Sequence, residues 1–373
     1  MKLAKPMRIG KYILLLLAAT AAAWGLLVYP TAASEGGTRG LGYCLDILIP
    51  SLFPFMVLST FLVKSGLSEK IGKVIEPVVR LLFHLPGCAG ATILMSIIGG
   101  YPVGARGIAA LYESGSITEK EAQRMLCFCV NAGPAFVISV VGSGLLGSPA
   151  AGVILFCAQI TVSLLLGIVV GLFSRKAKPA KRPPPRRTSG PALIESASDA
   201  ARGMTAMCTF VLLFAVLLSV LRESGFAQFF CATLLRMGVS APTAACLLSI
   251  LLEVTGGCYD ATSLGASFAL ISFAVGWGGI CVHFQVLSSV TKIRVSRIRF
   301  TLFRLLHGVL AAVIANFFYS ISPETKEVFS NTARRLQPDF SASAPAAGAL
   351  ILLCIVFLLC FPKETDLSER TAK

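Results

Sequence analysis

The chain has 373 residues, of which 55% are hydrophobic and 14% charged, and its mean hydropathy is +0.79. This composition excludes an ordinary soluble domain and is typical of a protein with several membrane-spanning helices. The formal net charge of +15 could suggest a nucleic-acid partner, but the basic residues cluster where a membrane protein carries them, so we expect no nucleic acid.

Six segments approach or exceed the length of about 20 apolar residues that a helix needs to cross a bilayer. They are residues 12–33, 43–63, 149–173, 207–222, 300–320 and 346–362. The first follows four basic residues and ends in TAAS, as a signal peptide does, but its length and the later spans favour a retained helix. The sequence therefore predicts an all-α polytopic membrane protein with an N-terminal transmembrane helix in residues 1–40.

Basic residues indicate how these helices cross. They gather at the N-terminus, in RKAKPAKRPPPRR (175–187) and in KIRVSRIRFTLFR (292–304). The positive-inside rule places all three segments in the cytoplasm, where anionic lipid headgroups would attract them. Residues 175–191 form a basic, proline-rich linker. We expect both termini in the cytoplasm, with 321–373 comprising an external loop, the last transmembrane helix and a cytoplasmic tail.

Between the early spans, residues 67–84 place apolar side chains on one helical face and charged ones elsewhere. This spacing predicts an interfacial helix kinked near Pro77. The alternative is an arm that packs under a transporter core.

An internal repeat organises the chain. FLVKSGL (61–67) resembles VLRESGF (220–226), SIIGGYPVGA (96–105) resembles EVTGGCYDAT (253–262), and CFCVNAGPAFVI (127–138) resembles SFAVGWGGICVH (272–283). The repeats, each with a following helix, occupy 41–174 and 192–320. The first contains an extra polar hairpin over 111–123, in which Thr118 and Glu121 predict a capping box. Helix 12–33 crosses outward, so helix 43–63 at the start of the first repeat runs inward, whereas helix 207–222 at the start of the second repeat runs outward from the cytoplasmic linker. The repeats therefore run in opposite directions, and inverted-topology repeats are typical of secondary transporters.

Four glycine- or proline-rich breaks interrupt the apolar helices, two in each repeat. Gly99 and Gly100 lie in the first, Gly256 and Gly257 in its counterpart, and the others are NAGP (131–134) and GWGG (276–279). Broken or re-entrant backbone at membrane depth is tolerated only beside protein or a water-filled cavity, so we expect the substrate site there.

Four polar side chains near the breaks are candidates for substrate binding. Arg106 either faces a cavity or reaches a lipid headgroup. Glu253 and Asp260 could pair with Arg106, bind a coupling cation, or be interfacial carboxylates. Asn131 suits a cavity and could also cap a half-helix. We predict no catalytic residues, metal or cofactor, because the chain lacks enzyme motifs and its twelve cysteines and three histidines are scattered.

The runs LIPSLFPFMVLSTFLVKSG (48–66), GGYPVGAR, NAGPAF and LLEVTGG resemble the Gate-domain, or nucleoside-recognition, membrane proteins, and specifically the sporulation integral membrane protein YlbJ family. By position in the family's motifs, the resemblance implies functional roles for Arg106, Asn131 and Glu253. The chain departs from the commoner asparagine-rich turn by having Gly133 before Pro134.

The resemblance implies a sporulation-associated transporter of a small organic anion, dipicolinic acid, in the outer forespore membrane. The alternatives are a permease for nucleosides or related small solutes and a non-transporting morphogenetic protein of the spore membrane. We expect no enzymatic activity. The binding partners would be a small-molecule anion and anionic lipids, with a homo-oligomer left open.

Overall fold

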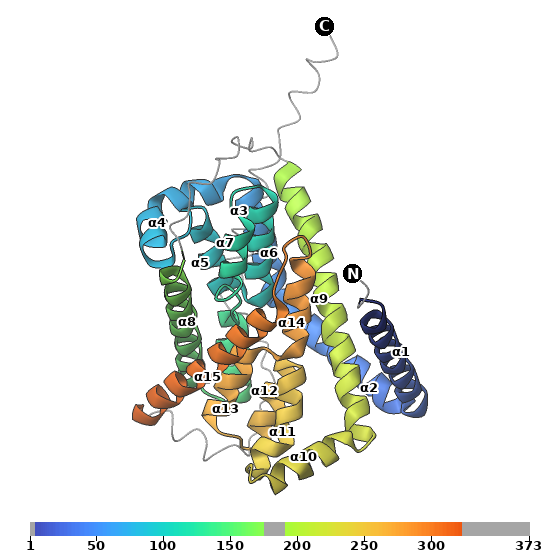
Figure 1. Ribbon diagram of the computed structural model, residues 1–373. Helices are drawn as coiled ribbons and strands as arrows, with labels where there is room; N and C mark the ends of the chain where they lie inside the picture. Colours follow the sequence, from blue (N-terminus) through green and yellow to red (C-terminus); the bar gives the residue numbers. More distant parts are fainter. Residues whose placement is uncertain (1–3, 175–190, 323–373) are drawn as a thin grey trace, which may run out of the picture.

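The protein is helical throughout the part of the chain that the structure describes. A computed structural model describes residues 4–174 and 191–322, where every regular element is a helix (Figure 1). Four helices there are long and apolar enough to cross a membrane: Pro149–Leu172, Ala192–Glu223, Phe268–Ser289 and Arg297–Ile321. The bent pair Pro30–Leu48 and Leu52–Lys64 passes the same test as one span with a bend of 57°. The all-α polytopic fold is therefore confirmed.

The first predicted span, over 12–33, is interrupted in the structure. α1 (Ala4–Val28) ends just before Tyr29, and α2 (Pro30–Gly42) begins at a proline, which lacks the N–H needed to continue the first helix. The π-helical turn η1 (Tyr43–Leu48) and α3 (Ile49–Lys64) follow. The predicted span over 346–362 and linker residues 175–190 lie outside the described residues.

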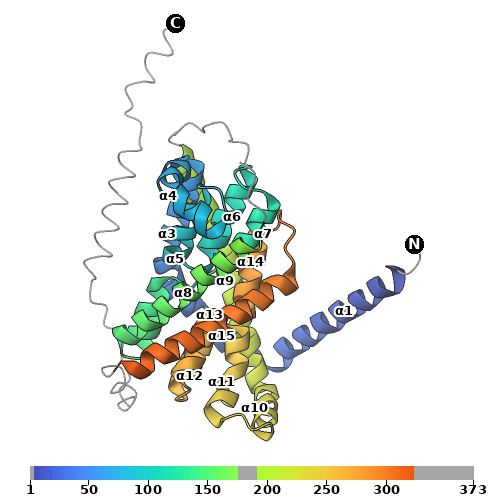
Figure 2. The same ribbon diagram turned by 60° about the vertical axis from the view of Figure 1, so that its left-hand side comes forward.

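From α3 onward, the helices follow the same order in two stretches. The first continues through α4 (Leu67–Phe83), α5 (Ala89–Gly99), α6 (Tyr101–Glu113), α7 (Glu119–Met125), the π-helical η2 (Ala135–Leu145) and α8 (Pro149–Leu172). The second comprises α9 (Pro191–Glu223), α10 (Phe226–Arg236), α11 (Ala241–Leu252), α12 (Val254–Ser263), α13 (Phe268–Trp277), α14 (Gly279–Ser289) and α15 (Arg297–Ile321). A left-handed glycine precedes both α4 and α10, Gly66 and Gly225 respectively. These two helices lie at opposite ends of the molecule in both views (Figure 1, Figure 2).

The amphipathic helix predicted over 67–84 is α4. Its exposed apolar side chains recur at helical spacing, at Ile71, Val74, Val78 and Leu81. On another face Val79 and Phe83 are buried in the core. An exposed apolar stripe on an amphipathic helix suits the membrane interface, because acyl chains can cover it.

Polar contacts from the extra hairpin and α7 reach the start of α15 and the end of the α8 region. The predicted capping box is present: Thr118 Oγ1 accepts from Glu121 N at 3.3 Å, and Glu121 Oε2 accepts from Thr118 N at 2.7 Å. On α7, Gln123 accepts from Arg299 at 3.0 Å, and Arg124 donates to the Ser174 hydroxyl. These contacts hold the start of α15 and the residue that follows α8 against the same short helix.

The helix breaks mostly fall at the predicted glycines. Gly100 separates α5 from α6 with a φ of 85°, and Gly278 and Gly279, with φ of 79° and 74°, separate α13 from α14. The third break differs, because it falls at the extended residue Glu253 rather than within 255–257. Those residues instead form the first turn of α12, where a Cβ at Gly257 would lie 2.7 Å from Ile250 Cα. Gly257 thus permits a close crossing of α11 and α12.

Candidate functional site

Arg106 lies in a pocket of about 430 Å³ between α3, α6 and α9, which we call the Arg106 pocket. Its Nη1 donates to the carbonyl oxygen of Asp199 at 2.6 Å. The guanidinium lies against Gly203, where any Cβ would overlap it. The remaining lining residues are Thr60, Val63, Lys64, Ala109, Ala110, Glu113, Ser114, Asp199, Arg202 and Ser289.

The charge of Arg106 is not neutralised by an ion pair among the described residues. The Asp199 carboxylate pairs with Lys64 at 2.6 Å and with Arg202 at 2.9 Å. Glu113 pairs with Lys292 at 3.1 Å. The Arg106 pocket is therefore lined by three cationic side chains and two carboxylates. Because both carboxylates already have partners, the pocket has capacity for an added anion.

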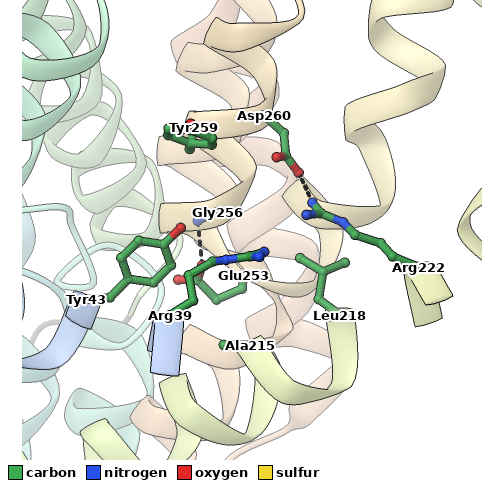
Figure 3. Close-up of a pocket in the computed structure, with 9 residues that line it drawn as sticks. All are labelled: Arg39, Tyr43, Ala215, Leu218, Arg222, Glu253, Gly256, Tyr259 and Asp260. Carbon is green, nitrogen blue, oxygen red and sulfur yellow. Dashed lines mark hydrogen bonds and ion pairs between the residues drawn. The ribbon is translucent and has the colours of Figure 1, made fainter. Parts of the chain in front are cut away.

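A second pocket, also of about 430 Å³, lies between α2, α9 and α12, and we call it the Asp260 pocket (Figure 3). Asp260 forms an ion pair with Arg222, which also donates to Ser249 Oγ at 2.9 Å. Arg39 and Tyr43 line the opposite side. The structure does not bring Arg106 to Asp260 or to Glu253, so the predicted pairing across the repeats is wrong.

Glu253 lies at the break between α11 and α12 and is only 3% exposed. Its carboxylate accepts from Thr255 N at 2.8 Å and from Gly256 N at 2.6 Å (Figure 3 draws the second bond). The carboxylate thus satisfies two orphan amides and the positive end of α12. A substrate anion would have to compete with Glu253 for this helix end, which makes the α12 N-terminus a poor anion site.

A narrow cavity of about 30 Å³ lies where the breaks meet. Gly100 and Gly133 are in close contact, because a Cβ at Gly133 would lie 3.1 Å from Gly100 N. This volume equals roughly one water molecule's share of liquid. The cavity, which we call the constriction, is lined mainly by apolar side chains: Leu48, Leu52, Gly100, Tyr101, Pro102, Gly133, Phe136, Met207, Val211, Glu253, Val254, Thr255, Val282 and Gln285.

The constriction lies between the two pockets. It shares Glu253 with the Asp260 pocket. Two helices connect it to the Arg106 pocket. On α6, Pro102 lines the constriction and Arg106, one turn later, lines the pocket; on α14, Gln285 and Ser289 have the same relation. Residues four apart share a helix face. The three spaces therefore follow one another along α6, α14 and the break at Glu253.

The remaining predicted residues lie around the constriction. Asn131 is fully buried and donates from Nδ2 to the Phe128 carbonyl at 3.1 Å, while its Oδ1 has no partner among the described residues. Gly99 contacts Val103, and Gly256 lines the Asp260 pocket. Asn131 does not line either pocket, so any contact with substrate requires rearrangement of the 131–134 turn.

A buried polar centre on α15 was not predicted from the sequence. Arg304, assigned with the basic segment to the cytoplasm, is 1% exposed and donates to the carbonyls of Val130 and Gly276. It also donates from Nη1 to His307 Nδ1 at 2.9 Å, and His307 Nε2 then donates to the Gln159 carbonyl at 3.0 Å. The spacing of Arg304 and His307 by three residues inside a predicted span is the signal that could have identified this centre.

Comparisons with known proteins agree with this architecture. Residues 46–149 match the model of the Gate family, described as nucleoside recognition. Over 319 residues, the chain is 27% identical to the sporulation integral membrane protein YlbJ of Bacillus subtilis (strain 168), covering 77% of this chain and 78% of the relative. No solved structure gives a significant match. The resemblance is confirmed: the chain is a multi-pass, all-α membrane protein, its residues 46–149 match the Gate family, and it is similar to the sporulation protein YlbJ.

Proposed function

We propose that the protein transports a small organic anion through the Arg106 pocket, the constriction and the Asp260 pocket. The observation that carries this proposal is the arrangement of two charged pockets of equal volume on either side of a narrow apolar constriction formed by helix breaks. Each pocket falls within the 300–1,000 Å³ range of small-molecule sites. A constriction of one water volume would keep the pockets separate until the helices move.

Alternating access between inverted repeats is the mechanism that we propose for this movement. The repeated helix order and the positions of α4 and α10 at opposite ends support it. In such transporters, half-helices meet near the membrane midplane and one repeat moves against the other. The constriction would open when Gly100 and Gly133, which stay in contact with each other, move away from the break at Glu253.

The proposed cargo is anionic because Arg106 carries the charge left without an ion pair in its pocket. An arginine offers a planar fork that binds a carboxylate through two parallel hydrogen bonds, which a neutral nucleoside would leave partly unused. Dipicolinic acid, a small aromatic dicarboxylate, fits this chemistry and the similarity to a sporulation protein. We propose the outer forespore membrane as its location.

Competition binding in detergent tests the cargo. We expect unlabelled dipicolinate to displace labelled dipicolinate and uridine or adenosine at equal concentration to leave it bound. Displacement by the nucleosides would overturn the anion proposal and favour a nucleoside permease, the alternative suggested by the Gate family's description. Arg80→Ala is a suitable control, because Arg80 is exposed on α4 and pairs with Glu76 away from both pockets.

A further inference from the structure

Two backbone discontinuities converge on one buried side chain. Gly276 is the penultimate residue of α13, where carbonyl groups lack partners within the helix. Val130 precedes the irregular turn 131–134 in the first stretch of the chain. The guanidinium of Arg304 donates to both carbonyl oxygens, and the Tyr101 hydroxyl donates to the neighbouring carbonyl of Val275.

No carboxylate lies within 4.0 Å of Arg304 among the described residues, so its neighbours are dipoles rather than charges. The C-terminal end of α13 supplies a partial negative charge. His307 accepts from Arg304 through Nδ1 and donates through Nε2, which makes it the neutral tautomer. The Tyr101 ring lies 5.6 Å from the guanidinium carbon, within the range of a cation–π contact.

Carbonyl oxygens at unwound segments and half-helix ends are the groups with which discontinuous-helix transporters coordinate metal cations. We propose that the Arg304 guanidinium is a built-in cation that takes the place of a bound metal ion between the two discontinuities. A permanent positive charge holds the Val130 carbonyl, just before the irregular turn, to the Gly276 carbonyl at the end of α13, so this position needs no Na⁺. This inference concerns the state of the protein itself and does not depend on the identity of its cargo.

Chemical rescue tests the built-in cation. Arg304→Ala leaves a cavity lined by the Val130 and Gly276 carbonyls and should lower the thermal unfolding midpoint in detergent. Guanidinium chloride at low millimolar concentration should recover most of that loss, while tetramethylammonium chloride should not. The control is Phe300→Ala, which removes another buried side chain from α15 one turn earlier. The proposal would be overturned if guanidinium chloride did not raise the unfolding midpoint of Arg304→Ala, or if it shifted the midpoints of both variants and the wild type equally.

Two further measurements apply even where Arg304→Ala fails to fold. Arg304→Lys keeps the charge but replaces the planar fork by one ammonium group, so its unfolding midpoint should be clearly lower than that of the wild type. An unchanged midpoint would contradict the bridge between two carbonyls. For the wild type, replacing K⁺ by Na⁺ at constant ionic strength should leave the midpoint unchanged, and a Na⁺-specific stabilisation would contradict the built-in cation.

Discussion

Gly203→Ala tests the position of Arg106 most sharply. Gly203 lies inside α9, and an added Cβ would overlap the Arg106 guanidinium. The helix itself favours alanine over glycine by about 0.8–1.0 kcal/mol. Displacing the guanidinium removes its hydrogen bond to the Asp199 carbonyl, and such a bond from a charged group contributes about 1.5–3 kcal/mol. We therefore expect a net destabilisation of about 0.5–2 kcal/mol, with transport nearly lost.

The assay pairs initial uptake into proteoliposomes with the free energy of unfolding in detergent. Gly37→Ala on α2 is the matched control, since a Cβ there meets Val216 at an ordinary 3.8 Å and transport should be unchanged. Wild-type transport by Gly203→Ala would show that transport does not depend on the guanidinium lying against Gly203.

Three further predictions follow from the site and the topology. Arg106→Ala should abolish transport while the protein stays at near-normal abundance, because removing a membrane arginine lowers an insertion penalty of about 2.5–3.5 kcal/mol. Arg106→Lys should retain part of the transport activity. Loss of the Arg106→Ala protein on a membrane blot would instead indicate a structural role. Reporters fused after Arg187 and Arg299 should both be cytoplasmic and one near Lys326 external, and opposite locations for the first two would exclude the inverted repeat. Leu52→Ala should widen the constriction and raise the passive efflux of loaded dipicolinate, so unchanged efflux would argue against a barrier there.

The long helices and most breaks could be predicted because each depends on local sequence. Apolar runs of membrane length gave α8 and α15 to within a few residues. Gly100, Gly278 and Gly279 adopt positive φ, which glycine allows at little cost. The capping box at Thr118 likewise needs only its own turn.

Features that depend on tertiary neighbours could not be predicted from the sequence. The α12 break moved to Glu253 because its carboxylate caps the helix, which allowed the following glycines to enter the first turn. The partner of Arg106 is a backbone carbonyl on α9, and a carbonyl has no signature in the sequence. Arg304 was grouped with its basic neighbours because charge counting does not distinguish a buried arginine from a cytoplasmic one.

Uptake of labelled dipicolinate into proteoliposomes that contain the purified protein tests the central claim of anion transport. Anion transport through the Arg106 pocket predicts time-dependent uptake by the wild type and by Arg80→Ala, with none by Arg106→Ala at equal protein incorporation. Uptake by Arg106→Ala at the wild-type rate, or no uptake by any folded form, would contradict it.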